Sequence, residues 1–170
     1  MGLLSKPIKT LDDLFVHTLQ DVYDAEQRIT KALQKMIEKV SDPQLKQAFQ
    51  SHLAETRGHI TRVEQVFRRH GEEPKAVTCR AIVGILEEAD EITGDASDQD
   101  VLDAAGLAAA QAVEHYEIAR YGTLIAWARQ LGRDDCARAL EPTLQEEKAA
   151  DVKLTQIAEA RVNRLAAQRA

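Results

Sequence analysis

Apolar residues recur every three to four positions along most of the chain, which is the spacing of one face of an α-helix. One series predicts a helix over 11–40 and another predicts a helix over 43–70. The two series are Phe15, Leu19, Val22, Ile29, Leu33, Met36 and Val40, and Leu45, Phe49, Leu53, Ile60, Val63 and Phe67. Thr10 can cap the first helix with Asp13 in a capping-box position, and Gly71 ends the second.

The second half of the chain carries three more amphipathic segments. Thr78 can cap a short helix over 79–92, and the polar stretch GDASDQD follows it. A long Ala-rich helix comes next and ends at Gly132, and Asp134 can begin another that runs almost to the end of the chain. Pro142 lies inside this last segment, where it either kinks the helix or marks its true start.

The lengths of the links predict how these helices are connected. The links after 11–40 and at Gly132 are short, so each joins two helices into an antiparallel hairpin. The link between the two hairpins is long enough to cross the length of a bundle. The sequence therefore predicts an all-α four-helix bundle, one domain over 1–170, with a long crossover and a short extra helix lying across it.

The two predicted hairpins also match each other at an offset of 91 positions. In this register Glu26 aligns with Glu117 and Glu55 aligns with Glu146, and several apolar positions coincide. Ala-rich helices align with one another by chance, but a single register that matches both hairpins indicates a duplicated unit. The repeat marks one glutamate on each long helix.

Composition narrows the classes of function. Aromatic residues make up only 4% of the chain, which favours helices over a β-sandwich or barrel. The net charge of −6 disfavours nucleic acid and anionic membranes as partners, and no apolar run is long enough to span a membrane. The segment MGLLSKPIKT lacks the apolar run of a signal peptide, and the two cysteines form no CxxC pair. We expect a cytoplasmic protein with free thiols.

Several acidic residues occupy places where apolar residues are expected. Glu26 falls within the apolar series of the first helix, and Glu117 does the same in the third long helix. On the second helix, Glu55 and His59 lie one turn apart and can reach the same part of the bundle. Because a buried carboxylate without a positive partner strongly destabilises a fold, something positive must compensate.

The last long helix leaves its acidic candidates open. The apolar series selects Glu147 and Asp151, one turn apart, whereas the repeat selects Glu146. Adjacent positions are about 100° apart on a helix, so both Glu146 and Glu147 stay candidates. Glu114, one turn before Glu117, is either a further ligand or a solvated residue.

These acids together predict a metal centre. A glutamate from each of two helices and a ligand pair from each of the other two can hold two iron or manganese ions in a bundle core. Carboxylates with one or two imidazoles suit Fe(II), with Mn(II) as the alternative. The candidate ligands are Glu26, Glu55, His59, Glu114, Glu117, Glu146, Glu147 and Asp151. The competing interpretation pairs each acid with an arginine. The other histidines, including His52, are not among the candidate ligands.

A resemblance to a known family rests on these residues. The segments DVYDAEQRITKAL, HLAETRGHITRVEQVF, AVEHYEIARYGTLIAWARQLG and LQEEKAADVKLTQIA resemble the YciE/YciF-type ferritin-like proteins, bacterial proteins associated with stress. The resemblance covers residues 5–160 and implies a ferritin-like bundle with a dinuclear metal site, usually in a dimer. It supports every candidate ligand above except His59, because this family's superfamily usually places the histidine three residues after its glutamate and here the gap is four.

Two functions of different classes follow. The first is a metal-dependent protein whose iron or manganese ions react with oxygen or peroxide, a small oxidant substrate. The second is a structural or interaction protein that retains a weakly occupied metal site. A homodimer is expected because several apolar residues do not all fit one core. These residues are Leu3, Leu4, Ile8, Ile125 and Trp127.

Overall fold

The computed structural model describes residues 7–169 and is helical throughout, with no strand in this range. This confirms the predicted all-α class. The helices are α1 (Leu11–Lys39), α2 (Pro43–His70), α3 (Arg80–Asp95), α4 (Gln99–Gln130) and α5 (Asp134–Ile157), followed by a π-helical turn, η1 (Ala158–Val162), and α6 (Asn163–Ala166).

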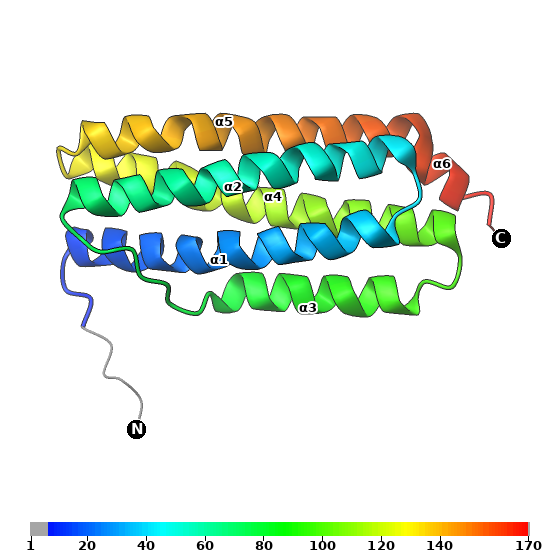
Figure 1. Ribbon diagram of the computed structural model, residues 1–170, viewed down its shortest axis with the longest axis horizontal. Helices are drawn as coiled ribbons and strands as arrows, with labels where there is room; N and C mark the ends of the chain where they lie inside the picture. Colours follow the sequence, from blue (N-terminus) through cyan, green and yellow to red (C-terminus); the bar gives the residue numbers. More distant parts are fainter. Residues whose placement is uncertain (1–6, 170) are drawn as a thin grey trace, which may run out of the picture.

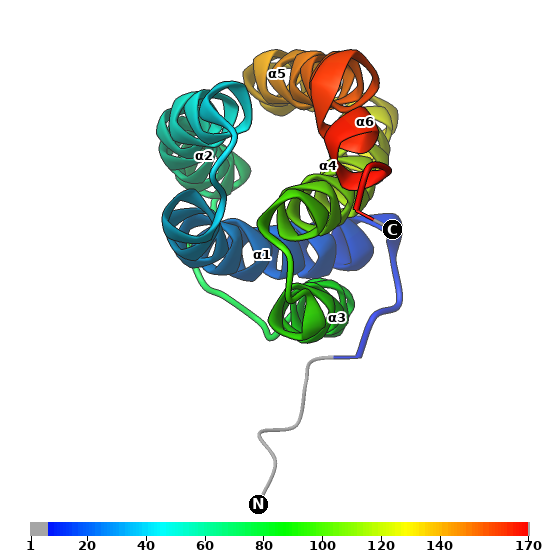
Figure 2. The same cartoon turned by 90° about the vertical axis from the view of Figure 1, so that its right-hand side faces the viewer.

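Four long helices form the bundle, and α3 lies outside it. Helices α1 and α2 run antiparallel, as do α4 and α5 (Figure 1). In the view along the bundle, α1, α2, α5 and α4 surround a common axis, and α3 packs outside against α1 and α4 (Figure 2). Because α2 and α4 point the same way, the chain must return along the bundle between them. Helix α3 makes this return, so it runs along the bundle and not across it as predicted.

Most helix ends follow the signals in the sequence. The Thr10 side chain accepts a hydrogen bond from the Asp13 backbone N–H, and the Asp13 carboxylate accepts one from Thr10, which confirms the capping box. At α3, however, the cap is Cys79 and not Thr78, because the Cys79 sulfur accepts the free N–H at the start of the helix. Pro142 lies inside α5 and does not mark its start.

The left-handed end of α2 gives a stability prediction. Gly71 has a φ of +85°, whereas Gly84 lies within α3, where an added Cβ would meet nothing within 4 Å. We expect Gly71→Ala to lower the free energy of unfolding by about 1–2 kcal/mol, since an L-residue is strained there. Gly84→Ala should instead raise it by about 0.5–1 kcal/mol. Urea denaturation measures both, and a shift of the same sign in the two variants would contradict the prediction.

The core is divided into two apolar clusters by a layer of buried polar side chains. One cluster lies toward the link between α1 and α2 and includes Ile29, Leu33, Leu45, Phe49, Leu107 and Leu154. The other lies at the opposite end and includes Phe15, Leu19, Val63, Phe67, Leu124 and Leu140. Along each bundle helix the buried residues change from apolar to polar and back to apolar. The polar layer is therefore shielded from solvent at both ends.

Candidate metal centre

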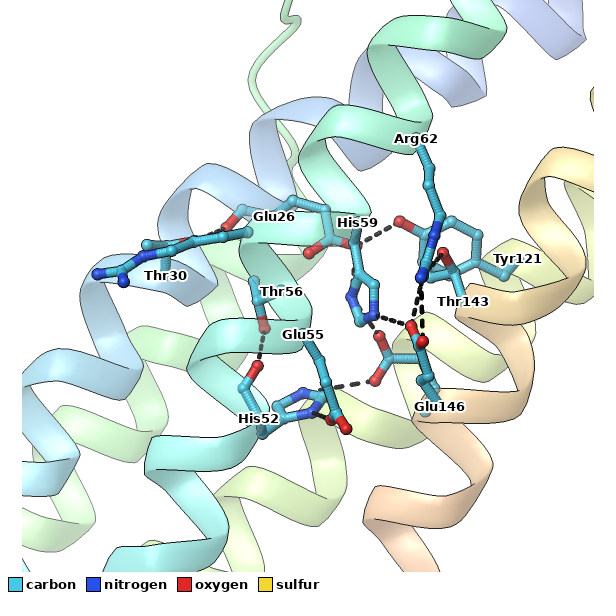
Figure 3. A network of polar contacts seen from close by, with 12 residues as sticks. Glu26, Thr30, His52, Glu55, Thr56, His59, Arg62, Tyr121, Thr143 and Glu146 are labelled. Atoms are coloured by element: carbon cyan, nitrogen blue, oxygen red, sulfur yellow. Dashed lines mark hydrogen bonds and ion pairs between the residues drawn. The ribbon is translucent and has the colours of Figure 1, made fainter.

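Six buried ionisable residues from all four bundle helices form the middle of this polar layer. They are Glu26 on α1, His52 and His59 on α2, Glu114 and Glu117 on α4, and Glu147 on α5. None is more than 5% exposed. Figure 3 shows Glu26, His52 and His59 pointing toward the interior between the helices. Groups that prefer water are thus gathered in the interior of the bundle, where burial disfavours their charged forms.

The six residues form two groups that share Glu147. His52, Glu114, Glu117 and Glu147 make up one, and Glu26, His59 and Glu147 make up the other, each with ligand atoms within 4.8 Å of one another. In the first group, His52 Nε2 lies 3.2 Å from Glu114 Oε1 and 3.5 Å from Glu147 Oε2. In the second, His59 Nδ1 lies 2.9 Å from Glu147 Oε1 and 3.5 Å from Glu26 Oε1. Glu147 is therefore the residue that the two groups have in common.

The hydrogen bonding of these residues tests whether they fit a metal. Among residues 7–169, nine buried side-chain nitrogen and oxygen atoms make no hydrogen bond of regular geometry, and eight of them belong to these six residues. The two histidine nitrogens among the eight lie within ion-pair distance of carboxylate oxygens in the same groups. The ninth is His70 Nδ1. Unpartnered buried polar atoms are rare in folded proteins, and a concentration of them requires an explanation such as an ion. Oxygen and imidazole nitrogen donors are those that Fe(II) and Mn(II) take.

The outward nitrogen of each histidine contacts a second glutamate at the rim of the centre. His52 Nδ1 lies 3.2 Å from Glu55, and His59 Nε2 lies 2.9 Å from Glu146. Arg62 donates hydrogen bonds to both carboxylate oxygens of Glu146 (Figure 3). A carboxylate that accepts from one ring nitrogen leaves the other nitrogen free as a ligand. The two histidines thus present different atoms, Nε2 of His52 and Nδ1 of His59.

Burial and mutual contact shift the pKa values of the centre. Burial, with the hydrogen bond and charge of Glu147, raises the pKa of Glu114 to about 11, and burial with the charges of Glu147 and Glu26 raises that of Glu117 well above its usual range. Burial lowers the pKa of His59, but hydrogen bonds that its ring donates to the carboxylates of Glu147 and Glu26 outweigh this effect and raise the pKa to about 10.

Two neighbouring acids stay ionised. Burial favours the neutral form of Glu147, but hydrogen bonds with His59 and Glu114 outweigh it and lower its pKa. The Arg62 guanidinium lowers the pKa of Glu146. Without a metal, Glu114, Glu117 and His59 therefore hold protons at neutral pH. These protons reduce the repulsion among the buried carboxylates.

The structure brings five of the eight sequence candidates into these two groups and leaves three at the rim. The five are Glu26, His59, Glu114, Glu117 and Glu147. Glu55 is 43% exposed and Glu146 is 30% exposed, each against a histidine. Asp151 accepts a hydrogen bond from Gln111 and lies 3.2 Å from His115 Nε2. On the last helix the geometry favours Glu147, the residue of the apolar series, over Glu146.

His52 belongs to the first group, and sequence reasoning did not select it. The apolar series predicted for this helix passes through Leu53 and Ile60, which are only half-buried. The buried face in the middle of α2 carries His52, Thr56 and His59 instead. The signal that could have found it is the seven-residue spacing of the two histidines, two turns apart on one face.

Comparisons with known proteins place the chain in a family. The model of a domain of unknown function, DUF892, matches residues 10–167. The chain belongs to this family. It is 46% identical over 164 residues to protein YciF of Escherichia coli K12, across 96% of this chain and 99% of YciF. The crystal structure of the E. coli stress protein YciF has a TM-score of 0.87 at 47% identity and covers 92% of this chain and 99% of its own. The resemblance to YciF-type proteins is confirmed.

Two further structures are informative in different ways. YcfI of Rhodopseudomonas palustris, described as a candidate structural protein, is 55% identical with a TM-score of 0.89, across 92% of this chain and 99% of its own. A ferritin-like, diiron-carboxylate protein of Bacillus anthracis has a TM-score of 0.67 at 18% identity, across 88% of this chain and 99% of its own. The second similarity shows the fold alone, and it confirms that this DUF892 member is a ferritin-like bundle.

Proposed function

We propose that the protein holds two divalent metal ions in the middle of the bundle, iron first and manganese as the alternative, and that these ions react with oxygen or peroxide. The observation that supports this most is the concentration, in six convergent residues, of eight buried nitrogen and oxygen atoms that make no hydrogen bond of regular geometry. The number and identity of the ions are part of the proposal. It also follows the diiron-carboxylate description of the B. anthracis protein.

The charges of the six residues match two such ions. Four carboxylates, from Glu26, Glu114, Glu117 and Glu147, carry four negative charges when ionised, which balance two divalent cations. His52 would ligate one ion and His59 the other, with Glu147 shared. When bound, the ions supply electron transfer to the oxidant. The chain's own part is to exclude water with its apolar clusters and to hold both imidazole rings through Glu55 and Glu146.

Metal analysis of protein purified without chelator tests the proposal. We expect about two iron or manganese ions per chain, the count of a bundle-core centre, and consumption of hydrogen peroxide by the Fe(II)-loaded protein but not by the metal-free protein. Well under one ion per chain would contradict the proposal. A loaded centre that leaves peroxide unchanged would retain the metal site and reject its redox role.

A second candidate function is a structural or interaction protein with a weakly occupied centre. The description of R. palustris YcfI favours it. The stress-associated name of E. coli YciF is compatible with either function. The candidate structural role predicts that loss of metal leaves the protein's interactions and physiological effect unchanged.

A homodimer is a further proposal, which rests on the YciF-type resemblance. Of the apolar residues that suggested it, Ile125 is only 4% exposed and belongs to the core, whereas Trp127 is partly buried and packs against the second cluster. Ile8 is 48% exposed, and Leu3 and Leu4 lie outside the described residues. Light scattering should give twice the chain mass of 18.9 kDa. A mass of one chain would contradict the dimer.

The cellular location also stays a proposal, and we place the protein in the cytoplasm. Among the described residues, no helix has the length and apolar character needed to cross a membrane. Both cysteines, Cys79 and Cys136, are buried and free. Free buried thiols are typical of reducing compartments, and fractionation of cells would test the location.

A further inference from the structure

A cavity of about 380 Å³ lies between α1, α3 and α4 and reaches inward to α2. Its exposed lining residues, Lys31, Lys35 and Glu87, lie on α1 and α3 and mark its mouth. Its inner end contains His52 and Glu114, both buried and both members of the first group of the candidate metal centre. The volume falls within the range of small-molecule sites. The cavity therefore connects the surface to one side of the polar layer.

The walls between mouth and inner end are mainly apolar. They include Ile29, Leu33, Phe49 and Val113, each no more than 7% exposed, together with the flexible side chain of Met36. Small residues from three helices keep the space open, namely Ala32, Ala89, Gly106, Ala109 and Ala110. Such walls favour apolar surface, which gains free energy on leaving water.

The charges at the mouth balance one another. Three cationic residues, Arg28, Lys31 and Lys35, face three anionic ones, Asp24, Glu87 and Asp90. Two ion pairs use most of this charge, with Arg28 Nε 2.6 Å from Asp24 and Lys35 Nζ 3.4 Å from Asp90. A charged ligand would gain no net attraction at the mouth and would lose its hydration against the apolar walls. The charge pattern thus selects an uncharged ligand.

We propose that this cavity binds an uncharged, mainly apolar molecule about as large as an eight-carbon alcohol, with one end against His52 and Glu114. This deepens the proposed function, on which it rests for any reaction of the ligand, because the ligand would lie beside the metal centre. Binding itself depends on the walls and not on the ions. The two proposals can therefore fail separately.

Methionine-methyl NMR with octan-1-ol and octanoate tests the binding. Met36 lines the cavity, so a label on its methyl group reports on a ligand bound there. We expect octan-1-ol to shift the Met36 signal saturably and to bind at least about tenfold more tightly than octanoate, since the chains match and only the charge differs. No saturable shift at Met36, or equal affinity for octanoate, would overturn the proposal.

Two variants at positions two residues apart on α4, which face different sides of the helix, locate the site. Ala110 lines the cavity, whereas Ala108 is exposed and does not. Ala110→Phe should weaken octan-1-ol binding at least about tenfold by filling the space, and Ala108→Phe should change it by less than about twofold. Undiminished binding by a folded Ala110→Phe variant would contradict the site. If that variant does not fold, the wild-type Met36 measurement decides alone.

Glu147→Gln separates this inference from the metal proposal. Glu147 does not line the cavity, so octan-1-ol should bind the variant within about twofold of the wild type even if no metal is held. Loss of binding in a folded Glu147→Gln variant would contradict a site formed by the walls alone. Wild-type protein that binds octan-1-ol but holds no metal would support the cavity and contradict the metal proposal.

Discussion

Glu147→Gln should abolish the binding of both metal ions, because Glu147 is the residue common to the two groups of the centre. A neutral amide supplies neither the charge nor the bridging pair of oxygens that two cations require. Wild-type protein at a free metal concentration of about 100 times Kd should gain about 2.7 kcal/mol of stability from each ion that binds independently. The variant should gain none. Metal analysis and thermal denaturation with and without Fe(II) or Mn(II) measure the two effects.

Neighbouring acids on α5 provide matched controls for this prediction. Glu146→Gln changes a residue that contacts His59 from outside, so we expect metal binding to weaken by about 10–100-fold without being lost. Asp151→Asn changes a partly exposed acid that belongs to neither group and should leave the metal content unchanged. Equal losses in all three variants would show that total negative charge, and not the geometry around Glu147, controls binding.

The helical architecture could be predicted because every part of it has a local signal. Apolar spacing, the Thr10 cap and Gly71 are properties of neighbouring residues, and the repeat offset also matches the structure, since α1 ends at Lys39 and α4 at Gln130. The orientation of α3 could not be predicted in this way. The direction of α3 depends on where α2 ends and where α4 begins in space. The residues of a short amphipathic segment do not determine those positions.

The candidate site was predictable only in part, for a related reason. Glu26 and Glu117 interrupt apolar series, so their burial could be inferred from spacing. In the middle of α2 the buried face is itself polar. A prediction based on apolar residues therefore follows Leu53 and Ile60 and does not select His52. The repeat identified Glu55 and Glu146 as equivalent, and both contact histidines from the rim. The two equivalent glutamates therefore do share a role, but that role is to contact a histidine, whereas the sequence pattern predicted them as metal ligands.

Metal-free protein should become less stable as the pH rises from about 5 to about 10, because the native state retains protons that the unfolded chain releases. The pKa of Glu114 rises from 4.5 to about 11 and that of His59 from 6.5 to about 10. A group whose pKa is higher in the native state than in the unfolded chain stabilises the native state fully at a pH below its unfolded-state pKa. This stabilisation is lost as the pH rises toward its native-state pKa. Each such proton contributes a slope of about 1.4 kcal/mol per pH unit where it applies. Urea denaturation across this pH range measures the slope.

Metal binding should reverse this dependence, since the ligands must release their protons to the solvent before they coordinate ions. At pH 7 the protons on Glu114, Glu117 and His59 are those to be displaced, so loading should release on the order of two to three protons per chain. Calorimetry in two buffers of different ionisation enthalpy counts them. Glu114→Gln carries no titratable proton at that position and should release about one fewer. Metal uptake without proton release would mean that the ions bind elsewhere than among these buried carboxyl groups, because only there does the native state hold such protons at neutral pH.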